Sequence, residues 1–149
     1  MKIKLILNND ERVFEVEPGE MLVDVLRRYG FTSVRRGCDT GSCGVCTVLL
    51  DGNPIPSCST LAVRAEGHHV TTVEGVQEEA ETIGQFLTAE GVDQCGFCSP
   101  GFVLTAIAMK RQLKNPTLEE MKHFLVGNLC RCSGYEGHIR ALKKYMEVE

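Results

Sequence analysis

The sequence predicts an α+β protein in which a β-rich half precedes a helical half. Alternating and β-branched apolar residues recur up to about Gly75, as strands require. Beyond Gln77 the apolar residues repeat with a period of about 3.6, which is typical of helices. Eight cysteines divide into two sets of four, one in each half. A chain of 149 residues has room for one typical domain or two small ones.

The first half should begin with a hairpin followed by a helix. Residues 2–7 and 12–16 flank the turn Asn8-Asn9-Asp10, whose residue types tolerate tight geometry. Pro18-Gly19-Glu20 opens a segment with apolar residues at helical spacing, which ends at Gly30. Three further β-rich runs follow, the first two joined by an Asp-Gly turn: 47–50, 54–56 and 70–73.

The second half is expected to contain about four helices. Thr117 with Glu120 forms a capping-box pattern, which marks the start of one of them. The other helical segments are recognised by apolar residues on one face, around 83–87, 103–109 and 139–145. The connection at 76–81 is acidic and is not enriched in Pro or Ser, so the two halves should pack together.

Charge and hydropathy exclude several classes of partner. The net charge is −4 and no basic run exceeds a pair, so no phosphate-binding stripe is present and nucleic acid is not expected. Residues 1–7 lack the apolar core of a signal peptide, and the apolar run 101–109 is far shorter than the roughly 20 residues of a membrane span. We therefore expect a soluble cytoplasmic chain without membrane insertion, where clustered cysteines bind metal more often than they form disulfides.

The first cysteine set has the plant-type 2Fe-2S spacing. Its members follow the pattern C-x4-C-x2-C with a fourth cysteine after eleven more residues: Cys38, Cys43, Cys46 and Cys58. Interspersed glycines let the backbone wrap tightly and direct N–H groups at an anionic centre. The Asp51-Gly52 hairpin can return the chain so that the fourth thiolate reaches the same centre.

The second set consists of a C-x2-C pair and a C-x-C pair separated by 31 residues: Cys95, Cys98, Cys130 and Cys132. Each pair precedes a helical segment, so both are expected at helix N-termini, where partial positive charge stabilises thiolates. The order helix, cysteine pair, helix occurs twice, over 82–114 and 117–146. This repetition suggests two helical hairpins that donate two ligands each to one shared metal centre.

Other uses of these cysteines remain open from spacing alone. Four disulfides are disfavoured because a secreted context is missing. Zinc is a stronger alternative, above all for the second set, because such pairs bind tetrahedral Zn²⁺ well. The chain would then be a zinc-stabilised interaction module without a redox role. A free-standing ferredoxin would leave the helical half without a role. His68 and His69 are interpreted as part of a solvated loop, and His123 and His138 as surface or partner-contacting residues.

Four motifs contain cysteines: Arg36-Gly37-Cys38, Gly41-Ser42-Cys43-Gly44-Val45-Cys46-Thr47, Gln94-Cys95-Gly96-Phe97-Cys98 and Gly127-Asn128-Leu129-Cys130-Arg131-Cys132-Ser133-Gly134-Tyr135. Together, in their order and spacing, these motifs resemble the small iron–sulfur subunit of the xanthine dehydrogenase family of molybdenum hydroxylases. Val45, Ser99 and Ser133 are mild departures from residues common in that family, as is Gly137-His138, and none removes a ligand.

The resemblance implies a particular architecture. Residues 1–76 would form a ferredoxin-like β-grasp domain, and residues 77–149 an all-α four-helix domain, each with one 2Fe-2S cluster. Both sets of four cysteines would be cluster ligands. Gln94, through its amide, and Cys132, through its backbone, match positions that contact the pterin in this family.

The resemblance also implies a heteromeric complex, expected as a dimer of heterotrimers. A large subunit would hold molybdopterin and carry out the hydroxylation, and a medium subunit would hold FAD. The present chain would have no catalytic residue of its own and would pass electrons from molybdenum to flavin. Xanthine or another purine is the first expectation for the substrate of the complex, with nicotinate-like heterocycles and aldehydes among the rivals.

Overall fold

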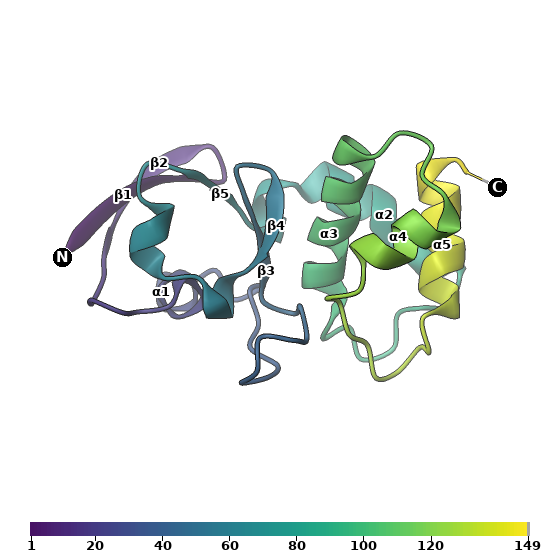
Figure 1. Cartoon of the computed structure of the whole chain (residues 1–149), viewed down its shortest axis with the longest axis horizontal. Coiled ribbons are helices and arrows are strands. Elements are labelled where there is room, and N and C mark those ends of the chain that lie inside the picture. Colours follow the sequence, from purple (N-terminus) through teal and green to yellow (C-terminus); the bar gives the residue numbers. More distant parts are fainter. Residues whose placement is uncertain (149) are drawn as a thin grey trace.

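The structure is a computed structural model that describes residues 1–148. A mixed sheet with one helix comes first and a group of helices follows, which confirms the α+β class (Figure 1). Strand β1 pairs with β5 in parallel, and the other pairings are antiparallel, in the order β2-β1-β5-β3-β4. The elements of this half are β1 (Lys2–Leu7), β2 (Asp10–Glu15), α1 (Leu22–Arg28), β3 (Thr47–Leu50), β4 (Asn53–Pro56) and β5 (His69–Thr71).

The first core lies between the sheet and α1. Ile3, Leu5 and Leu7 alternate along β1 and are all buried, as the period of two residues predicts. The apolar residues of α1 pack on them, and Leu22 and Leu26 are fully buried. Burial of such a side chain stabilises the fold by roughly 1.5–3 kcal/mol.

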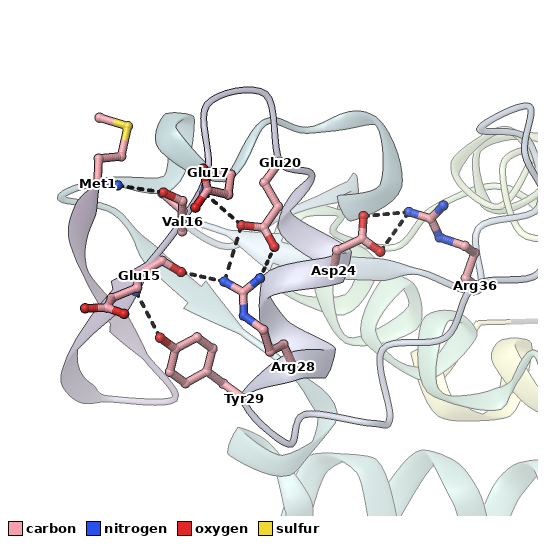
Figure 2. Close-up of polar contacts among 9 residues, drawn as sticks. All are labelled: Met1, Glu15, Val16, Glu17, Glu20, Asp24, Arg28, Tyr29 and Arg36. Atoms are coloured by element: carbon pink, nitrogen blue, oxygen red, sulfur yellow. Dashed lines mark hydrogen bonds and ion pairs between the residues drawn. The ribbon is translucent and has the colours of Figure 1, made fainter.

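Polar contacts join the N-terminus, the segment that follows β2 and helix α1 (Figure 2). The amino group of Met1 donates a 2.8 Å hydrogen bond to the carbonyl of Val16, which fixes the first strand against the segment after β2. The Arg28 guanidinium, from the last turn of α1, pairs with the Glu20 carboxylate and also donates to the carbonyl of Glu15. The last turn of α1 is thereby attached to the end of β2.

The second half contains α2 (Gln77–Ala89), α3 (Ser99–Gln112), α4 (Leu118–Phe124) and α5 (Glu136–Met146). The predicted capping box is present, because Thr117 Oγ1 accepts from the Glu120 N–H at 3.3 Å while the Glu120 carboxylate accepts from the Thr117 N–H at 2.7 Å. Pro100 lies in the first turn of α3, where its missing N–H costs nothing.

Helix α3 is the central element of the molecule. Every residue from Gly101 to Met109 is buried, because α3 packs on β3 on one side and on α2 on another (Figure 1). Leu49 of β3 joins Leu104 and Ala108 of α3 in a small shared core. The apolar run 101–109 is therefore internal. No helix within residues 1–148 is long and apolar enough to cross a membrane.

The sequence predicted which strands exist better than it predicted the residues at which they end. Val73 was expected in a strand, but β5 ends at Thr71 and Val73–Gly75 forms a short 3-10 turn. The side chain of Asn8 explains this ending, because its Oδ1 accepts from the Thr72 N–H at 2.8 Å. A side-chain amide thus takes the place of the next strand partner. Two further 3-10 turns, Ser57–Ser59 and Ala62–Ala65, had no periodic pattern.

The two halves meet where backbone touches backbone. A Cβ atom added to Gly101 would collide with the carbonyl oxygen of Gly44 and lie 3.1 Å from the Cα of Val45. The contact requires glycine in the first turn of α3, although glycine is a poor helix former. The halves pack together, as the composition of the connection predicts.

We predict opposite effects for two helical glycine-to-alanine substitutions. Gly101→Ala should lower the free energy of unfolding by about 1–3 kcal/mol, because backbone must move to admit the methyl group. Gly84→Ala in α2 is the matched control, since an added Cβ there meets nothing within 4 Å. It should raise the free energy by up to about 1 kcal/mol. Denaturant unfolding of the full chain measures both, and a neutral Gly101→Ala would show that the close contact is unimportant.

Candidate metal centres

Three cysteines of the first set lie in the loop between α1 and β3, and the fourth follows β4. Antiparallel pairing sets Thr47 opposite Pro56, so the β3–β4 hairpin returns Cys58 to the end of the sheet that Cys46 leaves. The buried hydroxyl of Ser57 donates to the Cys46 carbonyl at 2.6 Å and fastens the two segments together. The structure therefore brings the hairpin back as the sequence predicts.

Backbone amides converge on the sulfur of Cys38. Its pKa is lowered to about 6, first by the N–H of Cys43, then by the Cys43 thiol and by the N–H groups of Thr40 and Ser42. Gly41 and Gly44 have positive φ angles of 70° and 72°, which let the loop turn these amides inward. Such a cradle stabilises sulfur in its anionic form.

The sulfurs of Cys43 and Cys46 lie deeper than that of Cys38. Burial raises the pKa of Cys46 to about 11, opposed by the N–H of Cys58, and the neighbouring thiols of Cys58 and Cys43 raise it further. Burial also raises the pKa of Cys43, although the N–H groups of Val45 and Gly37 oppose the shift. The thiols thus face one another, and charging them without a cation is unfavourable.

An ion pair anchors the start of the loop. Arg36, two residues before Cys38, donates to both carboxylate oxygens of Asp24 at 3.0 and 2.9 Å (Figure 2). Asp24 lies on α1, which packs on the sheet. The first ligand candidate is therefore positioned by the core of the first half.

The second set comes together from two connections, one between α2 and α3 and one between α4 and α5. Cys132 Sγ lies 3.6 Å from Cys95 Sγ. The sulfurs of Cys98 and Cys130 lie within 4.8 Å of each other and of a ring nitrogen of His138. Both predicted pairs thus contribute to one group.

The position of these pairs relative to the helices differs from the prediction for one of them. Cys98 directly precedes α3, as expected. Cys132 does not lie at the N-terminus of a helix, because α5 begins only at Glu136. Gly134 and Tyr135, with φ angles of 70° and 72°, form a left-handed turn between them. This turn directs the chain back over the cysteines before the helix begins.

Sulfur environments also differ within the second set. Burial raises the pKa of Cys98 to about 12, and the thiol of Cys130 adds to the shift. Burial opposes ionisation of Cys130, yet its pKa is lowered on balance, with the hydroxyl and N–H of Ser133 the first donors. The N–H of Phe97 and the thiol of Cys132 lower the pKa of Cys95. Cys95 and Cys132 are exposed, so this group reaches the surface.

The two groups adjoin each other across the contact between the halves. The N–H of Leu129, next to Cys130, donates a 2.9 Å hydrogen bond to the carbonyl of Cys43. A groove of about 440 Å³ beside this bond is lined by cysteines of both sets together with Phe97 and Leu129. The sequence did not predict this adjacency, because it depends on how α3 docks on the sheet.

Three other predicted residues can now be placed. Gln94 is exposed and lines a small hollow with the second cysteine set. His68 is exposed and pairs with Asp51, Nδ1 to Oδ2 at 2.6 Å, in agreement with a solvated loop. His138 was expected at the surface, but only 3% of it is exposed. That interpretation is wrong, because the first turn of α5 faces the cysteines and carries His138 inward.

The residues fit a sulfur-rich anionic centre in each group. Each set offers four thiols, and backbone N–H groups are directed at several of their sulfurs. Amides around anionic sulfur are what a 2Fe-2S cluster requires. Zinc would also be satisfied by four thiolates, but it has no need for two groups in backbone contact.

Comparison with known proteins identifies the class. Residues 5–72 match a family profile described as a 2Fe-2S iron-sulfur cluster binding domain, and residues 72–143 match a 2Fe-2S binding domain. The chain is thus a 2Fe-2S-binding protein. It belongs to the small iron–sulfur subunits of the xanthine dehydrogenase family of molybdenum hydroxylases, and electron transfer is the activity that this membership supports.

Individual relatives agree over most of their length. The nicotinate dehydrogenase small FeS subunit of Eubacterium barkeri is 43% identical over 136 residues, 89% of this chain and 87% of the relative. The xanthine dehydrogenase iron-sulfur-binding subunit of Escherichia coli O157:H7 is 44% identical over 123 residues, 80% and 77% of the two chains. A chain of quinoline 2-oxidoreductase from Pseudomonas putida 86 superposes with a TM-score of 0.88 at 41% identity, covering 95% of this chain and 90% of that one.

Thiol reactivity tests the cradle around Cys38. In the metal-free chain, the Cys38 pKa of about 6 keeps it a thiolate at neutral pH, whereas the Cys46 pKa of about 11 keeps that thiol protonated. Because the thiolate is the nucleophile, we expect iodoacetamide to modify Cys38 well before Cys46. Its rate at Cys38 should fall as the pH drops through about 6. Peptide mass spectrometry of chain alkylated between pH 5 and about 8 measures this.

The control is the urea-unfolded chain, in which both thiols should titrate at about 8.5 and react alike. Equal rates in the folded metal-free chain would show that the amides do not converge on Cys38 in solution.

Proposed function

We propose that this chain carries two 2Fe-2S clusters and passes electrons between a molybdopterin centre and a flavin. One cluster would be held by Cys38, Cys43, Cys46 and Cys58, and the other by Cys95, Cys98, Cys130 and Cys132. The observation that carries this is the direct backbone contact between the two groups, Leu129 N–H to Cys43 carbonyl. When bound, a 2Fe-2S cluster accepts and releases one electron at a time.

The chain's own residues supply a short covalent and hydrogen-bonded connection. The Cys43 carbonyl accepts a hydrogen bond from the N–H of Leu129, and Leu129 is joined by a peptide bond to Cys130. Gly44 and Gly101 make the approach possible because neither has a side chain. The role of the protein is therefore to position two sites in contact and to exclude anything between them.

Exposure favours a direction along this connection. Cys95 and Cys132 are exposed and Gln94 lies beside them, whereas Cys46 is buried in the first half. A cofactor in a partner subunit could approach the second set closely. We infer that the Gln94 amide and the Cys132 backbone face the pterin, and that electrons pass from the helical half to the first half and then to flavin.

The domain boundary and the finer fold belong to the same proposal. We assign residues 1–76 to a ferredoxin-like β-grasp domain and residues 77–149 to an all-α four-helix domain. Support comes from the sheet with α1 packed on it, from the group α2 to α5, and from the two family matches, which meet at residue 72. The boundary falls at the start of α2, beyond the 3-10 turn Val73–Gly75.

The complex would be a cytoplasmic dimer of heterotrimers with a molybdopterin-binding large subunit and an FAD-binding medium subunit. We propose xanthine or another purine as its substrate, which the 44% identity to the Escherichia coli subunit supports. Nicotinate is the second candidate, because the nicotinate dehydrogenase subunit is 43% identical over a larger share of this chain. Turnover of each compound by the purified complex, followed with an electron-accepting dye, decides between them.

Cluster content tests the electron-transfer proposal. Full chain purified anaerobically should hold about four irons and four acid-labile sulfides, and dithionite should produce two distinct paramagnetic signals. Cys38→Ala should abolish one signal and Cys95→Ala the other, because each removes one ligand from one group. Electron paramagnetic resonance at low temperature measures both.

Ser42→Ala, in the same loop as Cys38 but without a ligand sulfur, is the matched control and should retain both signals. Stoichiometric zinc in a colourless protein without a paramagnetic signal would instead support the zinc-stabilised interaction module.

A further inference from the structure

His138 occupies an unusual place for a histidine in this chain. It lies in the first turn of α5, is 3% exposed, and its ring packs against that of Phe102 with 4.5 Å between centroids. An apolar side chain would fill such a site at lower cost, since a buried imidazole needs a hydrogen-bond partner. The identity of that partner indicates what His138 does.

The partner is the hydroxyl of Ser133. Ser133 Oγ lies 2.8 Å from His138 Nδ1 and 3.4 Å from Cys130 Sγ, to which it donates. The N–H of Tyr135 also donates to Ser133 Oγ, at 3.3 Å. The left-handed turn at Gly134 and Tyr135 brings Ser133 under the start of α5, between the histidine and the sulfur.

Counting hydrogens links the tautomer of His138 to the direction of the Ser133 hydroxyl proton. A serine hydroxyl has one proton and can accept two hydrogen bonds. Tyr135 N–H occupies one acceptor position. If His138 Nδ1–H occupies the other, Cys130 Sγ is the partner left for the serine proton within residues 1–148. In the opposite tautomer, Nδ1 would compete with the sulfur for that proton.

We propose that His138 is a positioning residue that donates from Nδ1 to Ser133 and so holds the Ser133 hydroxyl as a hydrogen-bond donor to Cys130 Sγ. The inference rests on the proposed function, in which Cys130 is a ligand of the second cluster. A donor to a ligand sulfur stabilises the more negative, reduced state, because the added electron increases the charge on sulfur. The pair therefore raises the reduction potential of that cluster.

Asp93 is the charged group that acts on His138, and its effect is secondary to burial, which lowers the pKa of the imidazole. In the first cysteine set, the Ser59 hydroxyl also lies 3.5 Å from a thiol, that of Cys58, but Ser59 is exposed and no histidine within residues 1–148 bonds to its hydroxyl. The two clusters are thus tuned by different surroundings.

Redox titration of the full chain in its complex tests the proposal. Ser133→Ala should shift the midpoint potential of the second cluster to a more negative value, and His138→Leu should shift it in the same direction. The double variant should shift no further than Ser133→Ala, because both changes remove the same donor. His138→Asn should restore the wild-type potential, since its amide N–H can replace Nδ1–H, and Ser133→Thr should retain it.

The first cluster is the internal reference and should keep its potential in every variant. His123→Leu, at an exposed histidine on α4, is the matched control and should leave both potentials unchanged. We call the chain of hydrogen bonds from His138 through Ser133 to Cys130 the relay. It would be overturned if His138→Leu left the midpoint potential of the second cluster unchanged, or if His138→Asn shifted that potential as His138→Leu does. If the wild type still holds about four irons per chain, the proposed function survives that result.

Pulsed paramagnetic resonance separates the relay from direct ligation. Cys98, Cys130 and His138 lie close enough for the imidazole to approach a metal. In the relay, the second cluster shows no strongly coupled nitrogen, and its spectrum is the same in the wild type and in His138→Asn. A strongly coupled imidazole nitrogen that disappears in His138→Leu would overturn the relay and make His138 a ligand. Absence of iron from the wild-type chain would overturn both this inference and the proposed function.

Discussion

The close approach of backbone to backbone at Gly44 is the constraint on which the rest of this structure depends. Gly101 of α3 touches the Gly44 carbonyl from one side, and a Cβ on Gly44 would collide with the Gly127 carbonyl from the other. Both cysteine loops are therefore held in one place by contacts without side chains. A side chain at either position would separate the loops, and the hydrogen bond from Leu129 to Cys43 would be lost. The spacing of the two cysteine groups thus depends on how α3 docks on the sheet.

The cysteine sulfurs differ in how deeply they are buried, and the difference affects what each set can do. Cys46 lies in the core of the first half, where its pKa rises to about 11, whereas Cys95 and Cys132 are exposed. A metal centre compensates buried thiolates for their lost hydration, so binding and folding should be linked most strongly at the first set. The exposed sulfurs of the second set leave that group accessible to a neighbouring subunit. One chain thereby combines a sheltered site with a site that faces outward.

Elements with a strong local pattern could be predicted from the sequence, and contacts between distant segments could not. The alternation in β1, the capping box at Thr117 and both cysteine sets all depend on spacing along the chain. The end of β5 depends on Asn8, and the proximity of the two sets depends on α3 packing against β3. His138 was misplaced for the same reason: its burial is decided by a left-handed turn at Tyr135, a residue type that rarely adopts positive φ.

The left-handed turn at Tyr135, which the sequence did not predict, also organises the hydrogen bonds around Cys130. Left-handed backbone at Tyr135 costs energy, so the surrounding structure must favour it. The Tyr135 hydroxyl accepts a hydrogen bond from the Cys130 N–H at 3.0 Å, and the backbone N–H of Tyr135 donates to the Ser133 hydroxyl. One strained residue therefore fixes the amide of Cys130 and the serine whose hydroxyl faces the Cys130 sulfur. If the potential of the second cluster is set by that serine, the strain at Tyr135 is part of how the helical half controls where electrons reside.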